Sequence, residues 1–397
     1  MSSKRILIQY PYNPFTKAHG VHTRYMQIFK YLKSRGIQID MISHKSFGDP
    51  WNDVMVMSNE IEHMIDNLYV NDKDVHHYKK TKLSKKISGL ISRKEGKQTD
   101  FLDSNQFPDY AYQNLQEQYN KILKTRKYDM VLITYPMWAN LIKNIDRSIT
   151  TFMTIEDFMS LNYFDKSNGK INIGNYLGEE IKRTNYFDKV ICISKEEMAF
   201  FERFCKKPKF YHIPHMMPLM EMRTENEKTI DITYVGSNNQ FNRDGMIWFF
   251  EKVVPFLNPD YKITIIGKVN EHLDRYKNKY SNYDFVNFAE ELEPYYHSSK
   301  ITICPMFGGT GLKIKVIESL SFGLPCVTTD LGIVGMEDSS KNGCIVTNNA
   351  ELYAMHIRDL IENQEYRNKI SREAYEYFQQ NYTEEEIFYK MDDVFLK

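Results

Sequence analysis

Short runs of apolar, mostly β-branched residues alternate along this chain with longer stretches in which apolar residues recur at helical spacing. The runs predict strands at 5–10, 37–43, 130–136, 150–155 and 189–194 in the first half, and at 231–237, 262–267, 283–288, 300–306, 326–330 and 344–347 in the second. Strands that alternate with amphipathic helices form parallel sheets built from βαβ units. The pattern therefore predicts an α/β fold with two Rossmann-like domains in series.

The stretch between the two sets of strands, residues 211–229, contains two prolines and ends in a polar tail, which is typical of a linker. We therefore expect a first domain over 1–210 and a second over 230–380. A C-terminal helix over 381–397 would follow, packing back on the first domain. Parallel sheets of this kind bind ligands beyond the carboxyl ends of their strands, so the expected site is a cleft between two facing domains.

Composition and charge exclude several classes of protein. The chain has 52 basic and 52 acidic residues among 397, so net charge offers no argument for a nucleic-acid partner. Its five cysteines form no CxxC pair, and most lie in or beside apolar runs, as expected of buried, reduced thiols. The sequence shows no signal peptide and no apolar run long enough to span a membrane. These features predict a cytoplasmic protein, soluble or peripherally attached.

The stretch FGGTGLKIKVIESLSFGLP, residues 307–325, combines a glycine cluster, two lysines and a glutamate. Its pattern predicts a helix over 312–322 that Gly323 and Pro325 terminate. A glycine turn that opens into a helix exposes N–H groups at the positive end of the helix dipole, which suits a phosphate. Lys313 and Lys315 would add positive charge, and Glu318 would accept hydrogen bonds from a ribose diol. Together these parts predict a nucleotide-diphosphate site.

A purely structural explanation of the same residues is open at this point. Lys315 and Glu318 are three positions apart and would suit a surface ion pair worth about 0.2–0.5 kcal/mol. Glycines between a strand and a helix also permit tight packing without binding a ligand.

The stretch resembles the signature of the family-4 (group 1) glycosyltransferases of the GT-B fold, in particular their exopolysaccharide-type branch. The pattern G-x-G-x-[RK]-x-K-x-x-E-A-x-x-x-G-x-P-V is matched in place at seven positions, with Ser319 where alanine is usual. The matching residues are Gly309, Gly311, Lys313, Lys315, Glu318, Gly323 and Pro325. Residues 187–194, 211–214, 232–257 and 331–336 are similar to further landmarks of the family in the same order.

The resemblance implies that the first domain holds the acceptor and the second binds a nucleoside diphosphate sugar. Two departures concern the donor. Many relatives carry two glutamates eight residues apart. The second corresponds to Glu318, and the position of the first is Thr310 in this chain. The arginine that often follows the glycine of the first donor-domain strand is replaced by Ser237. Lys313 or Lys315 is then the expected diphosphate partner.

On the first domain, relatives commonly have a glycine pair that approaches the donor phosphates, and this chain has His19 and Gly20. Gly20 keeps the backbone role, whereas His19 and His22 would be either catalytic or ordinary loop histidines. Glu156 and Asp157 follow a strand at the point where relatives often have acidic or histidine residues near the reacting carbon. They are the catalytic candidates, although N-capping of a helix by Asp157 is an equal and compatible explanation.

The resemblance thus implies transfer of a sugar from a nucleoside diphosphate sugar to a glycan or glycolipid acceptor, with retention of configuration and without a metal or other cofactor. A noncatalytic GT-B subunit that supports a partner enzyme is the alternative, favoured by Thr310. An epimerase acting on the nucleotide sugar itself is also open. A dinucleotide-dependent dehydrogenase would need a GxGxxG after the first strand, and the chain has none there. The base, the sugar, the acceptor and the oligomeric state are not readable from residue types.

The segment 78–97 carries eight basic residues and one acidic residue. Leu83, Ile87, Leu90 and Ile91 fall on one face of a helix, with lysines on the remainder. This pattern is typical of a helix that lies in the interface of an anionic membrane. A solvated loop, or a helix docked on the first domain by its apolar residues, explains the pattern equally.

Overall fold

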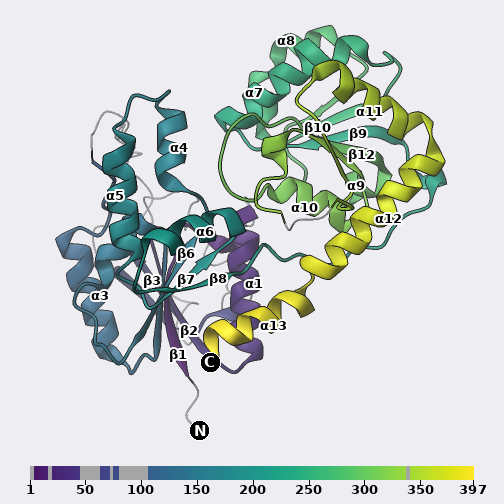
Figure 1. Ribbon diagram of the computed structural model, residues 1–397. Coiled ribbons are helices and arrows are strands. Elements are labelled where there is room, and N and C mark those ends of the chain that lie inside the picture. Colours follow the sequence, from purple (N-terminus) through teal and green to yellow (C-terminus); the bar gives the residue numbers. More distant parts are fainter. Residues whose placement is uncertain (1–3, 17–19, 45–62, 72–74, 80–105, 337–339) are drawn as a thin grey trace, which may run out of the picture. The chain divides into compact units, whose positions relative to one another are not determined.

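The computed structural model describes residues 4–16, 20–44, 63–71, 75–79, 106–336 and 340–397. The chain divides into two compact units, Met1–His212 and Ile213–Lys397. Each unit has its own twisted sheet with helices packed around it (Figure 1). All five cysteines are unpaired, and four of them are buried, as the sequence predicted.

The sheet of unit 1 has eight strands in the order β4-β3-β2-β1-β5-β6-β7-β8. Every neighbouring pair is parallel except β3 and β4. The strands are β1 (Arg5–Gln9), β2 (Gln38–His44), β3 (Asn67–Asn71), β4 (Val75–Lys79), β5 (Met130–Thr134), β6 (Thr150–Ile155), β7 (Lys189–Cys192) and β8 (Lys209–His212). The chain builds outward from β1 in one direction and then from β5 in the other. The boundary between β1 and β5 is therefore the topological switch point at which such sheets bind ligands.

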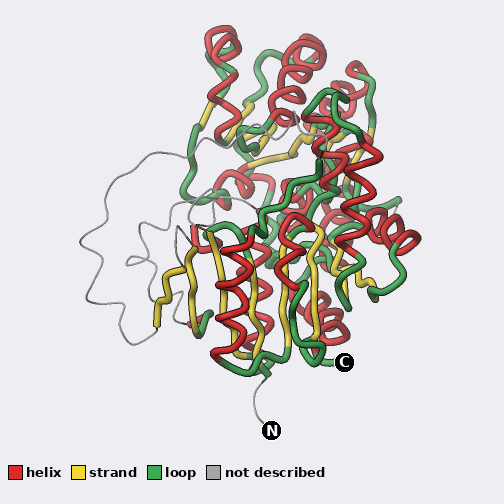
Figure 2. Tube along the Cα trace, turned by 90° about the vertical axis from the view of Figure 1, so that its left-hand side faces the viewer, coloured by secondary structure: helices red, strands yellow, loops and turns green. Residues whose placement is uncertain are grey.

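The helices of unit 1 connect these strands and lie along its sheet (Figure 2). The α-helices are α1 (Gly20–Ser34), α3 (Gln113–Thr125), α4 (Met159–Lys166), α5 (Ile173–Thr184) and α6 (Lys195–Phe204). Short 3₁₀ turns are η1 (Pro14–Thr16) and η3 (Pro136–Ile142).

Unit 2 has a six-stranded parallel sheet in the order β11-β10-β9-β12-β13-β14. Its strands are β9 (Ile230–Val235), β10 (Ile263–Ile266), β11 (Asp284–Val286), β12 (Ser299–Cys304), β13 (Cys326–Thr328) and β14 (Cys344–Val346). Its helices are α7 (Gln240–Trp248) with a π-helical continuation (Phe249–Val253), α8 (Asp274–Lys279), α9 (Glu293–Ser298), α10 (Ile314–Ser321), α11 (Ala350–Glu362), α12 (Gln364–Asn381) and α13 (Glu384–Phe395). Its 3₁₀ turns are η4 (Glu225–Glu227), η6 (Val254–Phe256), η7 (Lys268–His272) and η8 (Asp330–Gly332). The switch point of this sheet lies between β9 and β12.

The two doubly wound sheets confirm the α/β fold class, and each of the eleven expected strands is present. Three strands of unit 1 were missed. The strands β3 and β8 are short and carry polar residues at their ends, so no apolar run marks them. The strand β4 has the sequence VHHYK and pairs with β3 in an antiparallel hairpin that the βαβ pattern does not predict.

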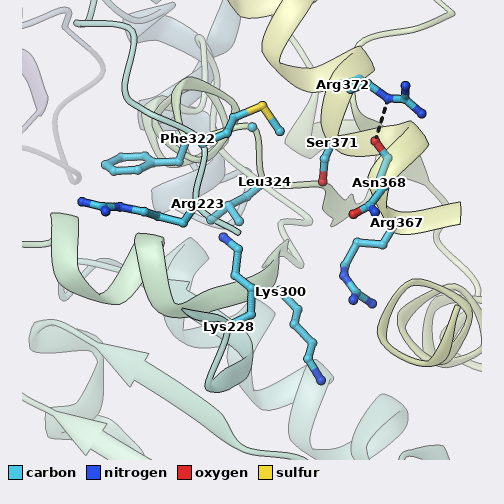
Figure 3. Close-up of a pocket in the computed structure, with 11 residues that line it drawn as sticks. Arg223, Lys228, Lys300, Phe322, Leu324, Arg367, Asn368, Ser371 and Arg372 are labelled. Carbon is cyan, nitrogen blue, oxygen red and sulfur yellow. Dashed lines mark hydrogen bonds between the residues drawn. The ribbon is translucent and has the colours of Figure 1, made fainter. Parts of the chain in front are cut away.

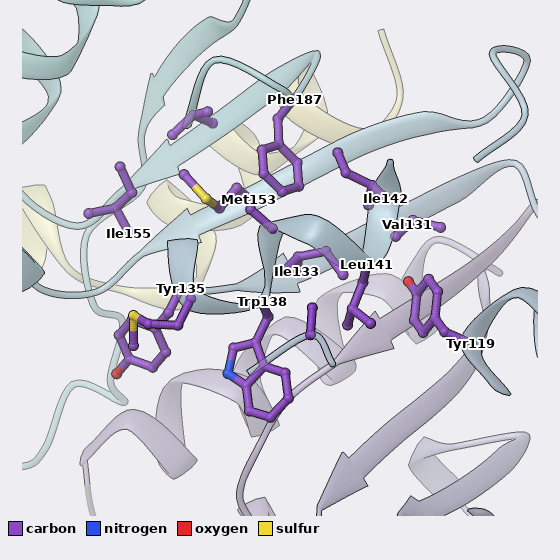
Figure 4. Packing of buried hydrophobic residues seen from close by; sticks show 14 of the residues in the cluster. Tyr119, Val131, Ile133, Tyr135, Trp138, Leu141, Ile142, Met153, Ile155 and Phe187 are labelled. Carbon is purple, nitrogen blue, oxygen red and sulfur yellow. The ribbon is translucent and has the colours of Figure 1, made fainter. Parts of the chain in front are cut away.

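The core of unit 1 lies where α3 and η3 cover the central strands (Figure 4). Trp138 of η3 is 1% exposed, and Tyr119 of α3 is fully buried. Side chains of β5, of β6 and of the residue two positions before β7 fill the layer between these helices and the sheet. They are Val131, Ile133, Met153, Ile155 and Phe187. Burying one large apolar side chain of this kind contributes about 1.5–3 kcal/mol, so this layer stabilises the packing of the helices on the unit 1 sheet.

A buried carboxylate ties the strands of unit 1 together at the opposite edge. The Asp40 side chain in β2 has no exposed surface and forms an ion pair of 2.7 Å with Arg5 of β1. It also accepts hydrogen bonds from the Asn67 amide of β3 at 2.7 Å and from the Tyr128 hydroxyl before β5 at 2.5 Å. One side chain thus connects elements from four parts of the sequence.

We expect Asp40→Ala to lower the free energy of unfolding by about 3–5 kcal/mol, because it removes the acceptor of two partly buried arginines, Arg5 and Arg126, and of two neutral polar groups. Chemical denaturation of the full chain measures this loss. Glu202→Ala, which removes an exposed carboxylate from α6, is the control and should change stability by less than about 0.5 kcal/mol. Equal stability of the two variants would contradict the role of Asp40.

Candidate nucleotide-diphosphate site

The glycine-rich loop follows β12 at the carboxyl edge of the unit 2 sheet, beside the switch point. Gly309 and Gly311 have φ angles of +85° and +73°, which residues with a side chain rarely adopt. A Cβ atom at Gly308 would lie 2.5 Å from the ring of Phe241 in α7. The loop therefore needs glycine for its backbone conformation and for its close approach to α7.

Lys313 holds the shape of this loop. It is the N-cap residue of α10, and its Nζ donates to the carbonyl oxygens of Gly309 (3.2 Å), Thr310 (3.2 Å) and Gly311 (2.7 Å). No side chain caps the first turn of α10. The start of this helix thus combines an ammonium group, backbone N–H groups and the positive end of the dipole at one place.

The far end of α10 closes as the sequence predicted. Gly323 has a φ of +67°, and its N–H donates to the Leu320 carbonyl at 2.9 Å. The Leu324 N–H donates to the Ser319 carbonyl at 3.1 Å, which completes a Schellman motif. The helix begins two residues later than expected, at Ile314, because Lys313 stays outside the helix as its cap.

Lys315 lies in the first turn of α10 and contacts polar groups of α7 and β9. Its Nζ donates to the Asn242 Oδ1 at 2.5 Å and to the Tyr234 hydroxyl at 3.0 Å, and it sits 4.5 Å from the centre of the Tyr234 ring. Burial lowers the pKa of Lys315 to about 8. A lysine ammonium has three donors, so one proton remains for an anion.

Glu318 lies one turn further along α10 and is partly exposed. Its Oε2 accepts a hydrogen bond of 2.8 Å from the hydroxyl of Tyr296, which is buried in α9. Burial of the carboxylate raises the pKa of Glu318 to about 7. Lys315 and Glu318 each bond a different tyrosine, so the surface ion pair between them that their spacing suggested is wrong.

The first loop of unit 2 borders the same switch point. Gly236 to Asn239 follow β9, and Ser237 is exposed. The Asn242 side chain donates to the Ser237 carbonyl oxygen at 3.0 Å, while its own oxygen accepts the hydrogen bond from Lys315. Asn242 therefore couples Ser237 to α10. The sequence did not predict this link, because Asn242 lies within a helix, α7, that carries no recognisable motif.

At the carboxyl edge of the unit 1 sheet, Glu156 forms a buried ion pair with Arg24 of α1, at 2.9 Å. Both side chains are at most 2% exposed. Asp157, the next residue, is partly exposed. Of the two acidic candidates, Glu156 is thus committed to Arg24, and Asp157 remains the one that solvent or a ligand reaches.

Asp157 does not cap α4, contrary to the capping explanation offered above. Phe158 is the N-cap residue and makes no side-chain cap bond. Glu180 of α5 performs this task, because its carboxylate accepts from the Met159 N–H at 3.0 Å and from the Ser160 N–H at 2.8 Å. Burial raises the pKa of Glu180 to about 7.

Tyr135 is a residue of this edge that sequence reasoning missed. It follows the last residue of β5, beside the switch point, and has a φ of +67° despite its bulky side chain. Such backbone strain concentrates at functional sites. Burial raises the pKa of Tyr135 well above its usual value, and the charges of Asp157 and Glu156 raise it further. A run of strand-like residues gives no sign of a strained terminus.

Three candidates of unit 1 remain, and the structure describes two of them, Gly20 and His22. Gly20 is the first residue of α1, where the N–H groups of the helix begin. His22 is 1% exposed and packs edge-on against Tyr10 at 6.1 Å, as a core histidine does. His19 lies outside the described residues.

The basic segment 78–97 also lies outside the described residues, apart from its first two positions at the end of β4. Among the residues that the structure describes, no helix has the length and apolar character needed to cross a membrane. Within the same residues, no group of three or more histidine, cysteine or acidic side chains is arranged to hold a metal ion.

Comparison with known sequences identifies the second unit. Residues 229–363 match the family described as Glycosyl transferases group 1. The chain is 30% identical over 216 residues to an uncharacterized 44.6 kDa protein in the cps region of Klebsiella pneumoniae, covering 51% of this chain and 54% of that protein. It is 25% identical over 210 residues to an uncharacterized glycosyltransferase of Haemophilus influenzae, covering 48% and 58%. The chain thus spans little more than half the length of these relatives.

Solved structures share the whole fold at low identity. Sucrose-phosphate synthase from Thermosynechococcus elongatus superposes with a TM-score of 0.72 at 13% identity, covering 99% of this chain and 98% of the other. A mutant of TarM from S. aureus, in complex with Fondaparinux, alpha-GlcNAc-glycerol and UDP, gives 0.71 at 12% identity, covering 99% and 100%. The second unit thus matches the group 1 glycosyl transferases, and the whole chain has the GT-B fold of these solved structures.

Proposed function

We propose that this protein transfers a sugar from a nucleoside diphosphate sugar to a glycan or glycolipid acceptor in exopolysaccharide synthesis. The observation that carries the proposal is the arrangement around α10, where a glycine loop, a largely buried lysine and a partly buried glutamate meet at the switch point of unit 2. The relative in the cps region and the neighbour with bound UDP support the substrate class and the pathway.

Each part of this arrangement has a task in donor binding. The loop and the first N–H groups of α10 hold the diphosphate, and Lys315 neutralises its charge. Glu318 accepts hydrogen bonds from the two hydroxyls of the ribose. Lys313 keeps the loop in the binding conformation, since its ammonium group is used by three loop carbonyls. The site pairs each charged group of the donor with an opposite charge or an N–H group.

Bond cleavage leaves a nucleoside diphosphate with one more negative charge on its terminal oxygen. Fixed positive groups that face this oxygen stabilise the transition state, because they need no reorganisation as the charge develops. Lys315 and the start of α10 supply them, so we propose departure without a metal ion. Retention at the anomeric carbon is proposed from the family resemblance alone. On unit 1 we assign the acidic role to Asp157, with Tyr135 beside it.

The noncatalytic alternative rests on Thr310, which replaces a glutamate that many relatives place on the donor sugar. A binding subunit would retain nucleotide affinity without turnover. Incubation of the purified protein with a panel of nucleoside diphosphate sugars, followed by detection of released nucleotide, separates the two. Slow hydrolysis supports the enzyme, and an inert complex supports the binding subunit.

We expect Lys315→Ala and Glu318→Ala each to weaken nucleoside diphosphate binding about ten- to hundredfold, because each removes charged hydrogen bonds worth about 1.5–3 kcal/mol. Isothermal titration with UDP and the other common nucleoside diphosphates measures the change. Lys279→Ala and Glu376→Ala alter charges elsewhere in unit 2 and are the matched controls. Affinities that stay at the wild-type value in both site variants would contradict the assignment.

We expect Asp157→Asn to lower turnover by about 10²–10⁴-fold while the KM for the donor stays within about threefold, because a general acid–base or charge-stabilising group acts in the transition state. Glu156→Gln is the informative comparison. It disturbs the buried pair with Arg24, so its main effect should be a lower melting temperature. Full turnover in Asp157→Asn would move the acidic role to another residue.

A further inference from the structure

A second hollow of about 370 Å³ lies in unit 2, away from the candidate site (Figure 3). Its walls come from the segment 222–228, from the start of β12, from the turn between α10 and β13, and from the first turns of α12. Lys300 is the second residue of β12, and Leu324 comes two residues before β13. The hollow therefore opens at the amino edge of the sheet. About 20 Å of strand separates it from the glycine loop, at about 3.3 Å per residue.

The hollow is strongly basic. Of the eleven residues that line it, five are lysine or arginine and none is acidic. The basic residues are Arg223, Lys228, Lys300, Arg367 and Arg372. The chain as a whole has no net charge, so this concentration of one sign is a local feature. Like charges so close together repel one another, and a bound anion would offset that repulsion.

Two of the five have structural tasks. Lys300 forms an ion pair of 2.8 Å with Asp231 of β9. Arg367 is buried and donates to the carbonyl oxygens of Leu360 (2.6 Å) and Ile361 (2.8 Å) at the end of α11. These contacts explain both residues without any ligand.

Two further basic residues are held only weakly by the fold. Arg372 is exposed and donates to the Asn368 carbonyl, at 3.4 Å, rather than to a carboxylate. Arg223 makes a long, exposed pair with Glu227 at 3.4 Å, a kind that contributes about 0–1 kcal/mol. The fifth, Lys228, is partly exposed and points toward the hollow from the same segment as Arg223. Both arginines could therefore turn to an anion at little cost.

The walls combine polar donors with an apolar floor. Asn368 and Ser371 add an amide and a hydroxyl on the α12 side. Phe322 and Leu324 are buried and form the floor. Gly323 lies between them, and a Cβ there would meet Met222 at 3.0 Å, so the segment 222–228 seats closely on this turn. A ligand with an anionic group and a less polar remainder would therefore contact both the basic side chains and the apolar floor.

We propose that this hollow, defined by Arg223, Lys228 and Arg372 around Leu324, binds a compact phosphate ester such as a sugar phosphate. Arginine guanidinium groups pair with phosphate oxygens through two parallel hydrogen bonds, and the dianionic phosphate offsets this concentration of positive charge better than a singly charged carboxylate does. The volume is at the lower end for small-molecule sites, so a monosaccharide phosphate fits the hollow better than a nucleotide sugar does. The site is separate from the proposed donor site and does not depend on it.

Titration of glucose 6-phosphate into the full chain, with UDP at saturation to occupy any nucleotide site, tests the proposal. The pocket variant is Arg223→Gln/Lys228→Gln/Arg372→Gln. The matched control, Lys252→Gln/Lys279→Gln/Arg358→Gln, neutralises three charges elsewhere in unit 2. All six side chains lie outside the core, and melting curves verify that each variant folds.

We expect glucose 6-phosphate to bind the wild type and the control alike, and the pocket variant at least about tenfold more weakly, the loss of one charged hydrogen bond or more. Uncharged glucose should bind none of them measurably. Equal affinity in the pocket and control variants, or no binding to the wild type, overturns the proposal. Inorganic phosphate binding with the same affinity as the ester would overturn the role of the apolar floor.

Discussion

The contact between Lys315 and Asn242 holds the candidate site together. Lys315 belongs to α10, whose first turn follows the glycine loop, and Asn242 belongs to α7, which follows the other loop at the switch point. The Asn242 amide then reaches back to Ser237. A buried ammonium is unfavourable unless its protons are bonded, so this pair fixes both loops relative to each other. An arriving diphosphate would meet a positive charge that burial has already deprived of water.

Unit 1 shows the same principle at its own carboxyl edge. The pair of Arg24 and Glu156 is almost fully excluded from solvent and joins α1 to the end of β6. Glu180 accepts the first N–H groups of α4 immediately beyond. These two carboxylates position the backbone on either side of Asp157 and leave that residue accessible. In unit 1 the buried charges thus position the backbone, and the accessible Asp157 is the residue assigned to chemistry.

The sequence predicted most of the fold and the local geometry of the loop and helix at α10, because both depend on patterns within short windows. Strand runs, the glycines with positive φ and the end of α10 at Gly323 all have local causes. The partners of Lys315 and Glu318 could not be predicted, since Tyr234, Asn242 and Tyr296 come from three other elements and carry no motif. The backbone strain at Tyr135 likewise arises from packing between distant segments. So does the capping of α4 by Glu180 rather than by Asp157. The basic hollow is formed by four such segments, so no single stretch of sequence predicts it.

We propose that Lys315 and Glu318, on one helix, each bind the donor in their charged forms. Glu318 loses its proton as the pH rises through about 7, and Lys315 loses its own as the pH rises through about 8. Both groups are therefore charged in largest proportion between these values. The direct measurement is the affinity of the wild type for a nucleoside diphosphate sugar, whose esterified diphosphate does not titrate here, from pH 6 to 9. We expect a maximum in affinity between about pH 7 and 8, with the acidic limb lost in Glu318→Gln and the alkaline limb lost in Lys315→Arg. A flat profile, or a maximum that both variants retain, would contradict it.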